Sequence, residues 1–346
     1  MVSQRFSALI YFYKKHIEVK KMSVKIAIAG FGKLGAGVLN AARGSDGIEP
    51  LCIVTRRDPC SVSAPDCIPV ISFNDVLSLK GKVDVIILCF GSQGDRPYLS
   101  PMLAENFNIV DSFDDHAKIP EHFDRVNEAA YASGHTAIIS AGWDPGIFSL
   151  ARAAYSAFMP NGEYLTIWGP GVSQGHSNAL RNIPGVADAK QYTVPVSSAA
   201  RDFISGKHFS DPAHECHRRE CYVVAKKGFD RAKIEKRIKE MPDYFEGYDT
   251  SVTFVSKEEL DARHNGFPHA GRVIGRGRTA DGSLQTADLA LSLESNPAFT
   301  GSVLVAYARA AVKIYNEGRA GCFTPLDIPV AYFSELSPNE QRKKFL

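Results

Sequence analysis

The sequence predicts an α/β protein: an N-terminal Rossmann-type domain with a parallel sheet, then a second α+β domain with a mixed or antiparallel sheet. Three observations lead to this fold class. Apolar runs alternate with helical patterns from residue 22 to about residue 145, as in βαβ units. A glycine-rich turn follows the first run. From residue 164 the strand-like segments change character and indicate a more antiparallel sheet. A chain of 346 residues is long enough for two domains.

The first element is an apolar strand, Val24–Ala29, that leads into Gly30-Phe31-Gly32-Lys33-Leu34-Gly35. This Gly-x-Gly-x-x-Gly pattern is the dinucleotide-binding fingerprint, in which glycine permits a tight turn and lets the backbone approach a pyrophosphate. Glycine-rich turns also occur for purely structural reasons. The strand before the turn and the helical pattern after it favour the cofactor interpretation.

The second strand ends in Thr55-Arg56-Arg57. In proteins that bind NAD, a carboxylate that binds the ribose 2′-hydroxyl usually stands at this place. A guanidinium matches a phosphate instead. The sequence therefore predicts NADP as the cofactor.

Three further strands complete the first sheet, at Val83–Phe90, Asn108–Asp111 and Thr136–Ser140, with helices between them at 97–106 and 121–133. Ligands of such sheets bind outside the carboxyl ends of the strands. Polar and aromatic residues gather there, including Asp114 and Asp144. Either aspartate taken alone can also be interpreted as a helix cap.

The remaining elements belong to a second domain. Its expected strands are 164–168, 189–194, 220–225 and 251–255, with helices near 197–206 and 230–240. We therefore expect a poorly ordered extension at 1–21, a dinucleotide-binding domain at 22–147, a substrate-binding and dimerisation domain at 148–300, a helix near 301–317 that packs back on the first domain, and a flexible tail at 335–346.

Composition excludes several classes of function and partner. The net charge of +2 comes from interspersed residues, and nucleic-acid binding needs a clustered basic face. Seven irregularly spaced cysteines argue against a disulfide framework and indicate a reducing cytoplasm. The apolar stretch Phe6–Tyr13 is too short to span a bilayer, so we expect no membrane partner.

Three function classes remain. The first is a NADP-dependent oxidoreductase acting on a small zwitterion, supported by the cofactor signature and by polar residues in glycine-rich loops. The second is a semialdehyde dehydrogenase with a cysteine nucleophile, or a metal site, at His214–Cys221. That spacing matches no zinc pattern, and we expect Cys221 to be an ordinary buried thiol. The third is a non-catalytic NADP-sensing protein, for which no output module is visible.

The chain resembles the meso-diaminopimelate D-dehydrogenase family from about Ser23 to about Pro329. The motifs that carry the resemblance are Gly30–Gly35, Thr55–Arg57, Ala141-Gly-Trp-Asp-Pro-Gly146, Trp168-Gly-Pro-Gly-Val-Ser-Gln-Gly-His-Ser177, Arg181-Asn-Ile-Pro-Gly-Val186, Met241-Pro-Asp-Tyr-Phe245, Phe267-Pro-His-Ala-Gly271 and Asn296-Pro-Ala-Phe-Thr300. Chance agreement over so many unrelated segments is implausible.

The resemblance implies NADP-dependent oxidative deamination of meso-2,6-diaminopimelate at its D-centre. The products would be ammonium and L-2-amino-6-oxopimelate, which cyclises to tetrahydrodipicolinate, and the reverse reaction would serve lysine and diaminopimelate synthesis. The resemblance also implies a homodimer formed largely by the second domain. A broader NADP-dependent D-amino acid dehydrogenase of the same fold remains an alternative.

By the same resemblance, two groups of residues surround the substrate. Those at the reacting D-centre would be Asp114, Trp143, Asp144, Trp168, Gln174 and Gly175, and those at the distant L-centre would be Thr193, Arg219, His269 and Asn296. Asp114 and Asp144 would be catalytic, because paired carboxylates can hold the ammonium group and help it lose a proton. Different pockets at the two ends are what let a protein tell the halves of a meso compound apart.

The expected cofactor contacts lie in the glycine turn, after the second strand and at the carboxyl ends of the later strands. They are Gly30, Phe31, Gly32, Lys33, Leu34, Thr55, Arg56, Arg57, Cys89, Phe90, Gly91, Ser92, Ser112, Phe113, Asp114, Ala141, Gly142, Trp143, Asp144 and Pro145. No metal site is expected.

Overall fold

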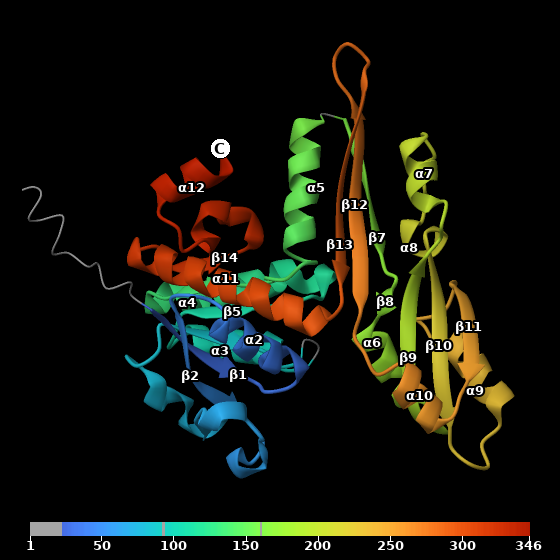
Figure 1. The fold of residues 1–346 in the computed structure, drawn as a ribbon, viewed down its shortest axis with the longest axis horizontal. Helices are drawn as coiled ribbons and strands as arrows, with labels where there is room; N and C mark the ends of the chain where they lie inside the picture. The colour runs from blue at the N-terminus through green and yellow to red at the C-terminus, as the bar shows by residue number, and fades with distance from the viewer. Residues whose placement is uncertain (1–22, 92–93, 160) are drawn as a thin grey trace, which may run out of the picture. The chain divides into compact units, whose positions relative to one another are not determined.

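The computed structural model describes residues 23–91, 94–159 and 161–346. The expected extension at 1–21 lies outside these residues. The chain divides into two compact units. Unit 1 contains the described residues up to Ala141 together with Gly301–Leu346, and unit 2 is Gly142–Thr300. Figure 1 labels many of the elements of both units, and each unit is described separately below.

Unit 1 is built on a seven-stranded sheet in the order β14-β6-β5-β4-β1-β2-β3. All of its strand pairs are parallel. The order β3-β2-β1-β4-β5-β6 within it is that of a Rossmann sheet, so the predicted fold class is confirmed. The strands are β1 Val24–Ala29, β2 Ile48–Thr55, β3 Val70–Ser72, β4 Val85–Leu88, β5 Ile109–Asp111, β6 Thr136–Ile138 and β14 Gly321–Phe323.

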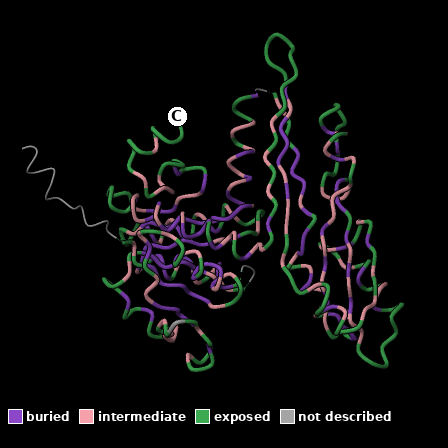
Figure 2. Tube along the Cα trace, viewed as in Figure 1, coloured by how far each residue is buried: buried purple, intermediate pink, exposed green. Residues whose placement is uncertain are grey.

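The central strands of this sheet are buried on both faces. Ile26–Ala29 and Val85–Leu88 have no exposed surface, and the buried class dominates this sheet in Figure 2. Their side chains include Ala27, Ala29, Ile86 and Leu88 of one apolar cluster. Continuous apolar runs of this kind are typical of parallel strands that are covered by helices on both sides.

Among the described residues, five α-helices belong wholly or mainly to unit 1. They are α2 Lys33–Arg43, α3 Arg96–Ala104, α4 Ile119–Ser133, α11 Asn296–Asn316 and α12 Pro338–Phe345, with short 3₁₀ helices at Pro59–Ser61, Pro65–Cys67, Phe73–Leu79, His116–Lys118, Pro325–Asp327 and Val330–Phe333. The α4 helix ends at Gly134, whose φ of 76° provides a left-handed cap. The expected flexible tail contains α12, which begins with a capping box between Ser337 and Glu340.

Helix α11 returns the chain to unit 1 and lies close to α2. A Cβ built on Gly301 would lie 2.4 Å from the carbonyl carbon of Gly37 and 2.6 Å from the nitrogen of Val38. Real Cβ contacts are never this short, so the two helix backbones meet where only glycine fits.

Unit 2 contains two sheets. One has the order β11-β10-β9-β8 and the other the order β13-β12-β7. Only the β10–β11 pair is parallel; the other pairs are antiparallel. The strands are β7 Glu163–Trp168, β8 Gly171–Val172, β9 Val186–Pro195, β10 His217–Ala225, β11 Asp249–Phe254, β12 His269–Arg278 and β13 Leu284–Leu293; the helices are α5 Ile147–Phe158, α6 Gln174–Arg181, α7 Ala199–Ile204, α8 Pro212–Glu215, α9 Arg231–Lys239 and α10 Lys257–Arg263.

The three-stranded sheet of unit 2 is covered on both faces. On one face Val273 of β12 packs with Phe148 of α5. On the other, the next residue, Ile274, packs with Phe203 of α7. This alternation follows from the period of two in a strand. The four-stranded sheet packs instead against α6 and α9, through Leu180 and other residues of a separate cluster.

Within the described ranges, no helix combines the length and apolar character needed to cross a membrane.

Candidate cofactor and substrate sites

The glycine turn of unit 1 lies between β1 and α2. Gly30 has a left-handed φ of +99°, and a Cβ there would lie 3.0 Å from backbone atoms of Cys89 and Phe90. A Cβ on Gly35 would lie 2.2 Å from the carbonyl oxygen of Gly30. A Cβ on Gly32 would meet nothing within 4 Å, so the N-terminus of α2 is open there. The turn therefore fits a bound pyrophosphate.

Two arginines follow β2 near this turn. The guanidinium of Arg57 donates to the carbonyl oxygen of Phe31 over 2.9 Å. Arg56 forms a bidentate ion pair with Asp95, with nitrogen–oxygen distances of 2.7 and 2.6 Å. The hydroxyl of buried Thr55 accepts the backbone N–H of Arg57 over 3.1 Å. The arginines therefore stand as the sequence predicts, but Arg56 has a carboxylate partner that the sequence did not reveal.

The other predicted cofactor residues of unit 1 lie at the carboxyl ends of its strands. Phe31, Lys33 and Leu34 belong to the glycine turn and the first turn of α2; Cys89, Phe90 and Gly91 follow β4; Ser112, Phe113 and Asp114 follow β5; Ala141 ends the first part of the unit. Ser92 lies outside the described residues. Asp114 is exposed, and Phe113 is buried with its ring stacked on His122 at 4.1 Å.

A buried carboxylate ties two of these strand ends together. One oxygen of Asp111 accepts the backbone N–H groups of Phe113 and Ser140 over 2.9 and 3.0 Å. The other oxygen binds Ser100 at 2.7 Å and His122 at 2.8 Å. Burial alone would raise the pKa of Asp111, but the hydrogen bond and charge of His122, with the other donors, hold it below its ordinary value. Asp111 thus fixes the loop that carries Asp114.

Trp143, His269 and Asn296 lie together in unit 2. The indole N–H of Trp143 donates to the side-chain oxygen of Asn296 over 3.0 Å, and the ring of His269 lies 5.0 Å from the Trp143 ring. Burial lowers the pKa of His269, so this imidazole is neutral near neutral pH. The segment Gly142–Pro145, with Trp143 in it, opens unit 2.

Asp144 is almost completely buried, with 2% of its side chain exposed. Its Oδ1 is 2.7 Å from Nη2 of Arg152, and its Oδ2 accepts the indole N–H of Trp168 over 2.7 Å. Both oxygens therefore have partners within unit 2. This arrangement orients the indole of Trp168. Asp114, the other expected catalytic carboxylate, belongs to unit 1.

The glycine-rich loop after Trp168 leads to the N-terminus of α6. Gly169 has a φ of +97°, and a Cβ on Gly171 would lie 2.6 Å from His269. Gln174 and Gly175 form the first turn of α6, which contains no acidic residue. A Cβ on Gly175 would meet nothing within 4 Å. The open N-terminus therefore offers backbone N–H groups and a favourable dipole to a carboxylate.

Arg219 lies across the sheet from Thr193. Its Nη1 donates to the Thr193 hydroxyl over 2.6 Å, and its guanidinium carbon lies 4.0 Å above the ring of Tyr248. The residue is 8% exposed, and its buried Nε has no hydrogen-bond partner. Burial lowers its pKa, against the opposing effect of Tyr248. Within the described part of the chain, no carboxylate forms a salt bridge with this buried cation, which leaves it suited to an anionic ligand.

Strand register explains why these residues converge. Thr193 of β9 faces Arg219 on β10 and Gly171 on β8. Gly271 of β12 faces Trp168 on β7. Residues far apart in sequence thus become neighbours across two sheets, and every predicted substrate residue except Asp114 lies in unit 2.

Neither cysteine of the His214–Cys221 segment is suited to act as a nucleophile. Burial raises the pKa of Cys216 to about 11 and that of Cys221 to about 12, so both stay protonated near neutral pH. Among the described residues, no group of three or more His, Cys, Asp or Glu side chains is suited to a metal. These findings leave the semialdehyde dehydrogenase hypothesis without its essential thiolate.

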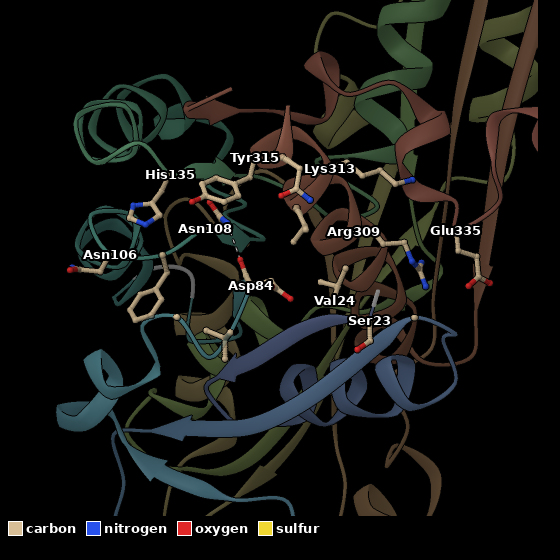
Figure 3. A pocket seen from close by; sticks show the side chains of 16 residues that line it. Ser23, Val24, Asp84, Asn106, Asn108, His135, Arg309, Lys313, Tyr315 and Glu335 are labelled. Atoms are coloured by element: carbon tan, nitrogen blue, oxygen red, sulfur yellow. Dashed lines mark hydrogen bonds between the residues drawn. The ribbon is translucent and has the colours of Figure 1, made fainter. Parts of the chain in front are cut away.

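A cavity of about 470 Å³ lies elsewhere in unit 1, near the amino ends of its strands (Figure 3). Its polar lining groups bind one another or the backbone. Asp84 accepts the backbone N–H of Lys25 over 2.7 Å, Asn108 donates to the carbonyl oxygen of Asp84 over 2.9 Å, and Lys313 donates to that of Ser334 over 2.6 Å. The glycine turn and the arginines lie at the opposite ends of the strands, so we do not assign the reaction to this cavity.

Several site residues could not be recognised in the sequence. Arg152 binds Asp144, Tyr248 lies under Arg219, and Asp95 binds Arg56. The buried Gln191, whose amide nitrogen is 3.5 Å from the Thr193 hydroxyl, has an unpartnered Oε1. Arg152 lies in α5 and Asp144 precedes that helix, so helical periodicity gave no signal for their contact.

Known proteins resemble this chain over nearly its whole length. Residues 142–295 match the model described as the diaminopimelic acid dehydrogenase C-terminal domain. The meso-diaminopimelate D-dehydrogenase of Ureibacillus thermosphaericus is 47% identical over 323 residues, which cover 93% of this chain and 99% of that protein.

Two solved structures are also similar. A multiply substituted meso-diaminopimelate dehydrogenase from Clostridium tetani, solved with diaminopimelate, is 43% identical, with a TM-score of 0.89 and coverage of 94% of this chain and 100% of that one. An engineered D-amino acid dehydrogenase bound to NADP⁺ is 36% identical, with a TM-score of 0.85 and the same coverage.

Proposed function

This chain belongs to the meso-diaminopimelate D-dehydrogenase family, and we propose that it oxidatively deaminates meso-2,6-diaminopimelate at its D-centre with NADP⁺. The amine and a hydride leave the D-carbon, and water supplies the new carbonyl oxygen. The products are L-2-amino-6-oxopimelate, which cyclises to tetrahydrodipicolinate, and ammonium. The reaction is reversible and serves lysine and diaminopimelate biosynthesis.

The observation that carries this proposal is the buried cation of Arg219, which forms no salt bridge with a carboxylate of the described residues. Leaving a guanidinium buried without an anion is costly, so a site that contains one is matched to a carboxylate ligand. Diaminopimelate has a carboxylate at each end. We propose that Arg219 binds the distal one, while the backbone N–H groups of Gln174 and Gly175 bind the carboxylate of the reacting end.

The other roles follow the resemblance and the contacts in unit 2. We propose Asp114, Trp143, Asp144 and Trp168 at the D-centre, and Thr193, His269 and Asn296 with Arg219 at the L-centre. Asp144 is bound by Arg152 and Trp168, so we propose that it acts mainly by orienting the Trp168 indole. Asp114, which is exposed, is then the better candidate for the group that holds the substrate ammonium.

For the cofactor, we propose that the pyrophosphate binds at Gly30–Leu34 and that Thr55, Arg56 and Arg57 bind the 2′-phosphate. We propose that the strand-end residues of unit 1 named above, from Cys89 to Ala141, would contact the nicotinamide half of the cofactor. When bound, NADP⁺ accepts the hydride, and the side chains of this chain orient the substrate toward it.

We further propose a cytoplasmic homodimer formed through unit 2. Support for the compartment is chemical: all seven cysteines are free, as in a reducing environment. Support for the dimer is the resemblance, together with the edge position of β13 in its sheet. Light scattering on the purified protein measures the mass directly, and a monomer at micromolar concentration would exclude this assembly.

A broader D-amino acid dehydrogenase is the second candidate, because the engineered enzyme of that activity has the same fold and 36% identity. One assay separates the two. NADP⁺ reduction is measured with meso-diaminopimelate, its LL and DD stereoisomers, and D-alanine, with NAD⁺ as a control. We expect rapid reduction with the meso isomer alone. Comparable rates with D-alanine would favour the broader enzyme, and no reduction with the meso isomer would refute the proposal.

A further inference from the structure

His217, at the start of β10, makes contacts that fix its protonation state. Its Nε2 accepts the backbone N–H of Trp168 over 2.9 Å, and its Nδ1 is 2.9 Å from the carbonyl oxygen of Ala213. A backbone N–H can only donate and a carbonyl can only accept. The proton of the ring must therefore be on Nδ1, and Nε2 must carry a lone pair. His217, which is 2% exposed, is a neutral imidazole with both nitrogens used.

The residue that His217 holds is at the centre of the proposed D-site. The Trp168 indole lies 5.4 Å from the imidazole ring and donates to Asp144 over 2.7 Å. Its backbone N–H is bound by His217, and the chain turns at once through Gly169, whose φ is +97°. Trp168 is thus fixed at two points, its backbone by His217 and its indole by Asp144.

We propose that His217 is a positioning residue for Trp168, and that protonation of His217 releases Trp168 and weakens substrate binding in acid. This inference rests on the proposed function, because it assigns an effect to the same site. A proton on Nε2 would face the N–H of Trp168, so the hydrogen bond would be replaced by two opposed donors in a buried place. Neither the metal site nor the nucleophile considered for His214–Cys221 is compatible with this use of both nitrogens.

The groups around His217 set the direction of the effect. Burial lowers its pKa, and the cation of Arg219 on the same strand lowers it further. The backbone carbonyls of Ala213 and Pro212, both in α8, act in the opposite direction. Trp168 on β7 contributes only a neutral N–H and a ring. The neutral form of His217 therefore prevails near neutral pH. The hydrogen bond from the Trp168 N–H to Nε2 is lost when the ring is protonated, at a pH below the ordinary histidine value of about 6.5.

The chain provides its own reporter for this change. It has two tryptophans, and Trp143 lies next to another histidine, His269. Trp143→Phe leaves Trp168 as the single fluorophore and removes that second titration. In this background three variants are compared with the parent. His217→Gln has an amide oxygen that can accept the N–H without titrating, His217→Leu cannot accept it, and His208→Gln is a control at an exposed histidine.

Trp168 emission is followed without substrate from about pH 8 to about pH 5. We expect one acid transition in the parent and in His208→Gln, and none in His217→Gln. A transition that persists in His217→Gln would overturn the proposal. Because no substrate is present, this result is independent of whether diaminopimelate is the true substrate.

Kinetics in the otherwise native enzyme then test the effect on the site. For His217→Leu we expect kcat/KM for meso-diaminopimelate to fall about tenfold at neutral pH, mostly because KM rises. A loss of this size is typical when a buried N–H is left without an acceptor. His217→Gln should stay within about threefold and lose the acid rise in KM, and NADPH binding should not change in either. Equal kcat/KM for the Gln and Leu variants would contradict the positioning role. If the Leu variant does not fold, the pH profile of the Gln variant still decides.

Discussion

At the scale of single residues, two buried polar atoms without hydrogen-bond partners lie in the proposed substrate site, and the described residues contain four others, in Arg96, His122, Ser140 and Tyr307. The Nε of Arg219 and the Oε1 of Gln191 are buried without hydrogen bonds, and both residues lie next to Thr193. Buried polar groups are almost always paired, so unpaired ones at one place indicate a missing ligand. By contrast, both carboxylate oxygens of Asp144 have partners, which supports the proposal that it acts mainly by orienting Trp168.

Arg152 gives a prediction at this scale. It is the ion-pair partner of Asp144 and also donates to Thr166 and Ser149 over 3.2 and 3.1 Å. Arg152→Met leaves Asp144 buried without its cation, which typically destabilises by about 3 kcal/mol or more. We expect a lower melting temperature and a rise in KM for diaminopimelate, measured by calorimetry and steady-state kinetics. Arg272→Met, at a half-exposed ion pair with Asp288, is the control that should change neither. Unchanged KM in Arg152→Met would separate Asp144 from the substrate site.

Asp95 gives a second prediction. It competes with any anion for Arg56, and its side chain makes no capping hydrogen bond to α3. Asp95→Asn should therefore lower the KM for NADP⁺ about two- to fivefold, the magnitude of an exposed ion pair, and leave the KM for NAD⁺ unchanged. A higher KM for NADP⁺ in Asp95→Asn would mean that Asp95 orients Arg56 for the phosphate.

The double variant Arg56→Ala with Arg57→Ala should raise the KM for NADP⁺ at least about tenfold.

At the scale of elements, the parallel sheet was predictable and the hairpin of unit 2 was not. The strands β1, β2, β4, β5 and β6 are apolar runs separated by helical patterns, and they lie where the sequence indicated. In β12 the sequence alternates glycine and arginine, which does not resemble a strand. The structure gives the reason: Cβ atoms on Gly275 and Gly277 would lie 2.8 and 2.7 Å from side chains of α5 and the adjoining Met159. Close packing there requires glycine.

The candidate site, too, could be predicted from the sequence only in part. The motifs placed the candidate residues on particular strands and turns. They did not fix the register that sets Thr193 opposite Arg219, nor the partners Asp95 and Arg152, which depend on contacts between distant segments. Such partners follow from tertiary packing, and a single sequence contains no local signal for them.

The close approach of α11 and α2 gives a prediction for the elements. Gly301→Ala would place a methyl group within 2.4 Å of the Gly37 backbone. The helices must separate, and we expect a loss of about 1–3 kcal/mol in the free energy of unfolding, measured by urea denaturation. Gly44→Ala is a suitable control, because a Cβ there would lie 3.6 Å from its nearest neighbour. Equal stability of the two variants would show that the helices are not in contact as described.

At the scale of the whole molecule, the chain crosses between the units twice, after Ala141 and before Gly301. The proposed cofactor residues lie mainly in unit 1 and the proposed substrate residues almost wholly in unit 2. This division is what a dehydrogenase needs when a nucleotide and a small zwitterion must be recognised by different chemistry. Conservation of the fold in the diaminopimelate dehydrogenase relatives accords with it.

The acid stability of the molecule depends on Asp111. Its folded pKa is below the ordinary value, so its carboxylate stabilises the fold above that value, and the contribution is lost as the pH falls through the folded pKa. We expect the free energy of unfolding to decrease below about pH 4. Asp111→Asn should be less stable by about 3 kcal/mol at neutral pH and should show a flatter acid dependence in denaturant titrations. An unchanged acid slope would assign that dependence to other carboxylates.

The most direct test of the central claim compares two enzymes on two substrates. The claim is that Arg219 binds the distal carboxylate of diaminopimelate, and D-lysine is the same molecule without that group. Wild type and Arg219→Met are each assayed for NADP⁺ reduction with both substrates, as a double-mutant cycle. We expect Arg219→Met to lose about 10- to 100-fold in kcat/KM for meso-diaminopimelate and to change little with D-lysine. Equal losses on both substrates would contradict the claim.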